Sequence, residues 1–112
     1  MKAARARQLL LGFANVSEAP HFDRVAFKTP RRTFATLASD GSDVNFMLDA
    51  LAQETLCEAA PEALAPVAGG WGRMGWTRCD LKKVGEPIFL AAAEAAHERA
   101  SAPPKKGRAR TR

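Results

Sequence analysis

The segment on which the fold depends is Gly69-Gly70-Trp71-Gly72-Arg73-Met74-Gly75-Trp76-Thr77-Arg78-Cys79-Asp80. It contains both tryptophans of the chain and four of its eight glycines. Because glycine has no Cβ atom, the first half of the segment can turn sharply and take positive φ values. The glycines stop after Gly75, and the residues from Trp76 to Leu81 favour a strand. We therefore expect a glycine-rich loop with Trp71 to lead directly into a strand with Trp76.

The length and composition are those of one small domain. A chain of 112 residues buries about two-thirds of its unfolded surface, which is enough for a single core. Alanine accounts for 23 of the apolar residues, so the six phenylalanines and two tryptophans must supply much of the packing. The two cysteines, Cys57 and Cys79, form no disulfide framework and match no metal-site spacing. We therefore expect a reduced, cytoplasmic protein. We also expect a monomer.

The sequence predicts neither a secretion signal nor a membrane span. Basic residues precede the apolar run Leu9-Leu10-Leu11, but Gly12 and Asn15 interrupt it before it reaches the length of a signal-peptide core. No stretch approaches the ~18 apolar residues that a membrane-spanning helix needs. We expect no membrane partner.

The net charge of +5 comes from the two ends of the chain. Five basic residues lie in the last eight positions and three in the first seven, whereas residues 8–104 carry nine basic residues against all twelve acidic ones. The basic residues of this body include two groups along the sequence, namely Arg24, Lys28, Arg31 and Arg32, and then Arg73, Arg78, Lys82 and Lys83. If folding brings the two groups together, the body has a positive face.

Hydrophobic periodicity and turn signals predict the elements of the domain. We expect helices over residues 2–14, 50–59 and 88–100, and strands over 24–28, 32–38, 44–48 and 76–81. The stretches 15–20 and 61–66 are expected to be a polar connection and a loop. Residues 1–102 would form the domain, and 103–112 a basic tail that is disordered because it has almost no apolar residues.

The predicted order of elements is therefore α-β-β-β-α-β-α. The short Asp40-Gly41 turn between the second and third strands favours an antiparallel meander. This indicates an α+β fold with an antiparallel sheet of about four strands and helices on one face.

Several residues of this pattern resemble the MmcQ/YjbR family. They are Pro20-His21-Phe22, Val25-Ala26-Phe27-Lys28, Phe34-Ala35, Gly70-Trp71-Gly72 and Gly75-Trp76-Thr77, in this order between about Leu10 and Ala100. The segment Trp-Gly-x-x-Gly-Trp-Thr is the most specific part of the match. The resemblance implies a bacterial protein with a small α+β domain, a double-wing motif, a frataxin-like shape and predicted DNA binding. The basic tail lies outside the matched region.

The first functional hypothesis is non-enzymatic binding of DNA or RNA. The candidate phosphate contacts are Arg31, Arg32, Arg73, Arg78, Lys82 and Lys83 in the body and Lys105 and Lys106 in the tail. Arg31 and Arg32 are expected at a hairpin tip. The tail would attract any polyanion without sequence preference. The alternative is that the basic residues of the body form a solvated sheet face and ordinary loop charges.

The second hypothesis is a pocket for a small ligand or a protein segment, formed by His21, Trp71 and Trp76, with no role in DNA binding. Trp76 is expected in the core or in a pocket wall, because the chain has few large side chains. Trp71 fits a buried and an exposed position equally well, and either indole could stack on a nucleobase. No acidic residue is spaced to orient His21 for catalysis, so we expect its ring to hydrogen-bond to the tryptophan segment.

The sequence contains no catalytic motif. It has no glycine-rich phosphate loop before a helix, no nucleophile elbow and no paired metal ligands. Iron-binding frataxins carry acidic residues on their first helix, whereas residues 2–14 have none. We therefore predict no catalytic residues, no metal and no cofactor. An unrecognised enzyme that uses the same pocket is the third hypothesis.

Overall fold

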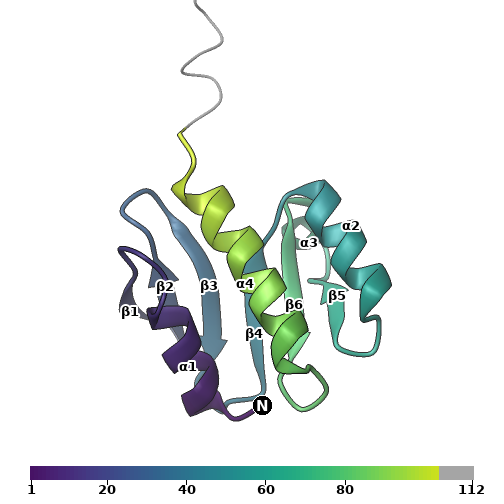
Figure 1. The fold of residues 1–112 in the computed structure, drawn as a ribbon, viewed down its shortest axis with the longest axis horizontal. Helices are drawn as coiled ribbons and strands as arrows, with labels where there is room; N and C mark the ends of the chain where they lie inside the picture. The colour runs from purple at the N-terminus through teal and green to yellow at the C-terminus, as the bar shows by residue number, and fades with distance from the viewer. Residues whose placement is uncertain (104–112) are drawn as a thin grey trace, which may run out of the picture.

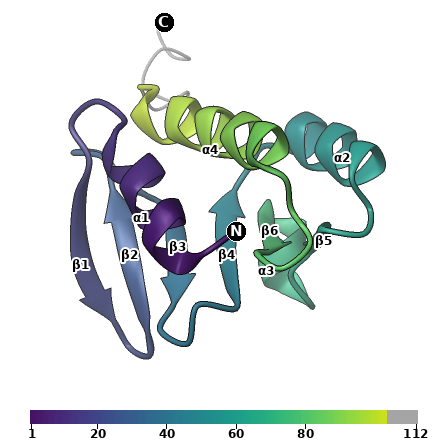
Figure 2. The ribbon, with the colours of Figure 1, turned by 60° about the horizontal axis from the view of Figure 1, so that its bottom comes forward.

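One antiparallel sheet organises the protein. The computed structural model describes residues 1–103, and within them six strands are arranged in the order β1-β2-β3-β4-β6-β5 (Figure 1). In that spatial order the strands are β1 (Ser17–His21), β2 (Arg24–Lys28), β3 (Thr33–Ala38), β4 (Asp43–Met47), β6 (Trp76–Asp80) and β5 (Leu64–Pro66). The helices are α1 (Ala3–Leu11), α2 (Ala50–Ala59), α3 (Gly70–Arg73) and α4 (Glu86–Ser101). Helices α1, α2 and α4 lie on one face of the sheet (Figure 2).

The α+β class and the position of the helices confirm the prediction from the sequence. The helix predicted over residues 50–59 has these bounds in the structure, and the Asp49 carboxylate accepts a hydrogen bond of 2.8 Å from the Ala52 backbone N–H. This is the N-cap expected of an aspartate at that position. The four predicted strands correspond to β2, β3, β4 and β6, with bounds that agree to within one residue.

The number of strands and the order of elements differ from the prediction. Strand β1 takes up residues 17–20 of the expected polar connection and extends to His21, and β5 forms the end of the expected loop over 61–66. Both strands lie at the edges of the sheet, and each contains a proline. Proline has no N–H to donate, which makes it a signal for loops, but an edge strand tolerates it because one side of its backbone has no partner. The observed order is α-β-β-β-β-α-β-α-β-α.

The core lies between the sheet and the three helices on its covered face. Phe27, Phe34, Phe46 and Phe89 are fully buried there. Helix α4 presents mainly small side chains to the sheet, namely Ala92, Ala93, Ala96 and Ala100. Small side chains let the helix approach closely, and the rings of Phe46 and Phe89 meet edge-on with centroids 5.3 Å apart.

The predicted basic tail lies almost entirely outside the part of the chain that the structure describes. Residues 104–112, including Lys105 and Lys106, are beyond the described range. Within residues 1–103, none of the helices combines the length and the hydropathy that crossing a membrane requires.

Candidate functional site

The face of the sheet opposite α1, α2 and α4 carries polar and aromatic side chains, and we call it the open face. Side chains alternate between the two faces along a strand. In β4, Val44 and Phe46 belong to the core, so Asn45 points to the open face. Asn45 is paired with Thr36 on one side and with Arg78 on the other, which places these three residues in one row across β3, β4 and β6.

A cavity of about 230 Å³ lies on the open face, and we call it the open-face pocket. Five of the six strands, α3 and the residue after β5 contribute to its lining. The lining residues are His21, Arg24, Thr36, Asn45, Val67, Trp71 and Trp76. The three residues that the sequence suggested for a pocket, which are separated by up to 55 positions along the chain, therefore line the same cavity in the structure. Sequence reasoning missed Thr36 and Asn45 because isolated polar residues in a strand carry no motif.

Two glycines determine the path of the chain between the two tryptophans. A Cβ atom on Gly72 would lie 1.9 Å from the carbonyl oxygen of Val67, so the backbone could not approach β5 as it does. Gly75 has a φ of 115°, and a Cβ atom there would lie 1.9 Å from the carbonyl oxygen of Leu48. Neither position accommodates another residue without a shift of the backbone.

The two tryptophans differ in exposure. Trp71 lies on α3, a four-residue helix where the sequence predicted a loop, and its relative exposure is 62%. Trp76 lies on β6 and is partly buried. Trp76 thus forms part of the pocket wall, one of the two positions expected for it, whereas Trp71 contributes little to the core. A large apolar ring left this exposed gains from being covered by a ligand or partner.

Gln53, on α2, fixes the tryptophan segment to the body of the protein. Its side-chain Nε2 donates hydrogen bonds of 3.0 Å to the carbonyl oxygen of Gly72 and to the hydroxyl of Thr77. The fully buried Thr77 hydroxyl in turn donates to the carbonyl oxygen of Gly75 at 3.0 Å. Gln53 was not identified from the sequence, since a single glutamine in a helix has no distinguishing context.

Arg24 is held in the pocket wall by an ion-pair network on the open face. Its Nε donates to the Thr36 hydroxyl at 2.8 Å, and its Nη2 donates to one Asp43 carboxylate oxygen at 2.6 Å. Arg78 donates from Nε to the other oxygen of Asp43 at 2.9 Å. The Asp43 side chain is only 13% exposed, so the carboxylate is largely shielded from water between the two guanidinium groups. Arg78, a predicted phosphate contact, therefore already has a partner within the protein.

The side-chain oxygen of Asn45 is buried and has no hydrogen-bond partner among residues 1–103. No other buried side-chain oxygen or nitrogen in that range lacks a partner. Leaving a buried acceptor without a donor costs about 1–3 kcal/mol, so such groups are rare and often have a functional explanation. Asn45 as a residue is partly exposed and lines the open-face pocket, whereas this oxygen is shielded from solvent, so a ligand N–H or O–H group supplies the missing donor once the side chain turns toward the pocket.

The β1–β2 loop next to the pocket contains an exposed aromatic residue in a strained backbone conformation. Phe22 is the first of two loop residues, its φ is 59°, and its relative exposure is 95%. Its ring meets the His21 ring edge-on with centroids 5.0 Å apart. The expected hydrogen bond from His21 to the tryptophan segment is not present in the described chain. Non-glycine residues in the left-handed region are concentrated at functional sites.

The other predicted phosphate contacts do not gather at one end of the sheet. Arg31 and Arg32 lie in the connection before β3, whereas Lys82 and Lys83 follow β6. Strands β3 and β6 are both antiparallel to β4 and so run in the same direction, which puts the start of β3 and the end of β6 at opposite ends of the sheet (Figure 1). Arg73 lies on α3, which precedes β6 and so stands at the end of the sheet where β3 begins. The two basic groups of the sequence therefore meet at Asp43, which Arg24 and Arg78 share, whereas the pairs Arg31–Arg32 and Lys82–Lys83 lie at opposite ends of the sheet.

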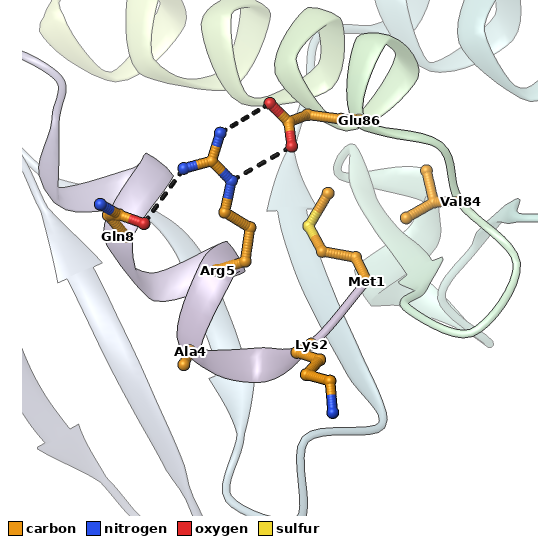
Figure 3. A pocket seen from close by; sticks show the side chains of 7 residues that line it. All are labelled: Met1, Lys2, Ala4, Arg5, Gln8, Val84 and Glu86. Carbon is orange, nitrogen blue, oxygen red and sulfur yellow. Dashed lines mark hydrogen bonds and ion pairs between the residues drawn. The ribbon is translucent and has the colours of Figure 1, made fainter.

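A second cavity, of about 500 Å³, lies beside α1 and is lined by Met1, Lys2, Ala4, Arg5, Gln8, Val84 and Glu86 (Figure 3). Three of its polar side chains, those of Arg5, Gln8 and Glu86, are already engaged with each other. Arg5 donates from Nε and Nη2 to the two Glu86 carboxylate oxygens at 3.1 and 2.9 Å, and from Nη1 to Gln8 at 3.1 Å. These contacts fasten α1 to α4, so this cavity is less suited to a ligand than the open-face pocket.

Comparison with known proteins reveals the fold. No protein-family model and no curated protein matches the sequence. The structure is similar to the crystal structure of the Deinococcus radiodurans protein DR2400, which carries the family-model domain DUF419. The TM-score is 0.71 and the sequence identity 17%, and the match covers 86% of this chain and 75% of that chain. DUF419 has the MmcQ/YjbR-type fold, so the fold that the sequence resemblance implied is the fold that this chain adopts.

Proposed function

We propose that the chain is a non-enzymatic binding module of the MmcQ/YjbR family, with residues 1–102 as its domain and the open-face pocket as its site. The observation that carries the proposal is the open-face pocket, in which two tryptophans lie beside Asn45, whose buried side-chain oxygen has no partner within residues 1–103. Apolar and aromatic walls with a few polar groups are the usual composition of small-molecule sites. The occupant is a small ligand or the end of a protein side chain.

The two tryptophans make this proposal directly testable. They are the only two in the chain, and both line the pocket, so each indole N–H signal in an NMR spectrum reports on the site. We use benzamide as the probe, since it combines a planar ring with an amide N–H donor. We expect both indole signals to shift as benzamide is added to the full chain, and the remaining Trp76 signal to shift less readily in Trp71→Ala.

Met74→Ala is the matched control for this titration. Met74 follows α3 directly and is 59% exposed, close to the 62% of Trp71, but it does not line the pocket. Its substitution should leave the response to benzamide unchanged. The proposal is overturned if neither indole signal responds, or if Trp71→Ala and Met74→Ala behave alike.

Nucleic-acid binding through basic residues is the second candidate function. It is favoured by Arg31 and Arg32, which are adjacent, exposed and without an ion-pair partner within residues 1–103. Neutralising a phosphate releases counterions, so binding through such residues weakens steeply with salt. Family resemblance supports this candidate as well, but the separation of Arg31 and Arg32 from Lys82 and Lys83 does not.

Fluorescence anisotropy with duplex and single-stranded DNA at two salt concentrations tests this candidate. The full chain is compared with three double variants: Arg31→Ala with Arg32→Ala, Lys82→Ala with Lys83→Ala, and Lys105→Ala with Lys106→Ala. Loss of affinity in the first variant alone identifies the β2–β3 connection as the contact. If affinity falls only in the tail variant, the body of the protein is not a DNA-binding domain.

A further inference from the structure

We infer that the open-face pocket takes a purine or pyrimidine base, either from a free nucleoside or from a single strand. The inference rests on the proposed function and adds the chemical class of the ligand. It follows from three properties of the pocket: its size, its aromatic walls, and the hydrogen-bonding groups between them. Each property restricts the ligand in a different way.

The size of the pocket limits the buried part of the ligand to one small ring system. Sites for drug-sized ligands have volumes of roughly 300–1,000 Å³, whereas this cavity measures about 230 Å³. A ring of the size of a nucleobase fits this limit. The sugar and any further nucleotides would remain outside, on the open face.

The walls favour a flat, aromatic group. Trp71 and Trp76 contribute two indole rings and Val67 an aliphatic side chain. Every nucleobase has a π face that stacks on such rings, and stacking of this kind tolerates different bases. The 62% exposure of Trp71 in the free protein leaves one indole largely uncovered, so a stacked base would bury surface that the fold itself does not bury.

The edge of the ligand must satisfy the Asn45 side chain. An amide offers one acceptor oxygen and one donor nitrogen side by side, and the oxygen of Asn45 is the buried atom that has no partner in the described chain. Purines and pyrimidines carry neighbouring donors and acceptors along their edges. Asparagine pairs with adenine through two hydrogen bonds of this kind, one to the amino group and one to a ring nitrogen.

The charge of the pocket favours a neutral group over an anion. Arg24 is the charged residue of the lining, and its Nε and Nη2 already donate to Thr36 and Asp43. Its positive charge faces the Asp43 carboxylate at 2.6 Å. A free carboxylate or phosphate in the pocket would have to compete with this contact, whereas an uncharged base would not.

Two matched pairs of nucleosides test the inference on the full, unmodified chain, with the indole N–H signals as the readout. The first pair is adenosine and purine ribonucleoside, and the second is cytidine and pyrimidin-2-one ribonucleoside. The second member of each pair lacks only the exocyclic amino group. In the pair that binds more tightly, we expect removal of the amino group to weaken binding on the order of tenfold, because the buried oxygen loses its donor.

Asn45→Ala supplies the second measurement. This variant removes the orphaned oxygen, so the two members of a pair should then bind with nearly equal affinity, whereas Trp71→Ala should weaken both members. A single-stranded DNA oligomer distinguishes the source of the base. If the oligomer shifts the same indole signals at a lower concentration than the nucleoside does, the ligand is a single strand. If the oligomer requires an equal or higher concentration, the ligand is the free nucleoside.

The outcomes separate this inference from the proposed function on which it rests. If benzamide shifts the indole signals but no nucleoside does, the pocket binds ligands and the nucleobase assignment is wrong. The assignment is also wrong if a nucleoside and its analogue without the exocyclic amino group bind with equal affinity. If no probe of any kind shifts the signals, the proposed function itself fails. Because the nucleoside pairs are compared on the wild-type protein, the result does not depend on the folding of a variant.

Discussion

Phe22 combines a backbone conformation that suits glycine with a side chain that is 95% exposed. A non-glycine residue in the left-handed region costs about 1–2 kcal/mol, and this ring recovers almost none of it through burial. Glycine adopts the conformation freely but makes the unfolded chain more flexible. We therefore expect Phe22→Gly to raise the free energy of unfolding by up to about 1 kcal/mol, as measured by urea denaturation.

Asp23→Gly is the control for this prediction. Asp23 occupies the second position of the same loop and is exposed, but its φ is not in the left-handed region. Glycine relieves no strain there, so the variant should lose about 0.5–1 kcal/mol of stability. A loss of stability in Phe22→Gly as large as that in Asp23→Gly would show that Phe22 is not strained.

The two cysteines should differ in reactivity. Cys79 is fully buried in the core, and burial raises the pKa of its thiol to about 12. Cys57 is partly exposed, and burial raises the pKa of its thiol as well. Because the thiolate is the nucleophile, a disulfide reagent at pH 8 should modify Cys57 in the native protein and Cys79 only after unfolding.

Counting thiols released with and without denaturant measures this difference. One reactive thiol per native chain and two per denatured chain is the expected result. In Cys57→Ser, the native chain should react negligibly. Equal rates for the two thiols in the native wild-type protein would contradict the burial of Cys79 beneath the helices.

At the scale of elements, the tryptophan segment depends on a helix that lies far from it in the sequence. Gln53 on α2 donates to the Gly72 carbonyl and the Thr77 hydroxyl, and so connects α2 with α3 and β6. Gln53→Leu keeps the approximate volume but removes both donors. We expect a loss of about 1–3 kcal/mol in the free energy of unfolding, together with broadening of the Trp71 indole signal as α3 loosens.

The control is Glu54→Leu, which introduces the same residue at the next position of α2. Glu54 is exposed and makes no hydrogen bond through its side chain in the described chain. Its substitution should change stability little and leave the Trp71 signal sharp. If Gln53→Leu leaves both stability and the indole signal unchanged, α2 does not support the pocket.

The elements that sequence reasoning predicted correctly are those with strong local signals. The Asp49 N-cap and the alanine-rich stretch after Pro87 were sufficient to identify α2 and α4. The edge strands β1 and β5 were missed because Pro20 and Pro66 normally indicate loops. Whether a short segment that contains proline becomes an edge strand depends on whether a neighbouring strand has a free side.

At the scale of the whole molecule, Asp43 joins three strands by accepting hydrogen bonds from Arg24 and Arg78. The partners lie 19 and 35 positions away along the chain. Asp43→Asn removes the charge and turns one acceptor oxygen into a donor group that faces a guanidinium. Because the network is partly exposed, we expect a loss of about 1–3 kcal/mol in urea denaturation, less than for a fully buried ion pair.

Asp40→Asn is the control for the ion-pair network. The Asp40 side chain accepts a hydrogen bond from the Ser42 backbone N–H at 2.9 Å, a contact that an asparagine oxygen can also make. This variant should therefore retain the stability of the wild-type protein. A similar effect of the two substitutions would mean that the Asp43 carboxylate contributes no more than a surface charge.

The sequence alone determined the α+β class, the central strands, the helices over the core and the importance of the tryptophan segment. These features depend on local propensity, periodicity and capping, which neighbouring residues encode. Three features follow from the folded chain and not from local sequence: Asn45 lines the open-face pocket, Asp43 binds both Arg24 and Arg78, and the pair Arg31–Arg32 lies at the opposite end of the sheet from Lys82–Lys83. These features depend on strand order and register, which bring distant residues together and leave no trace in the local sequence.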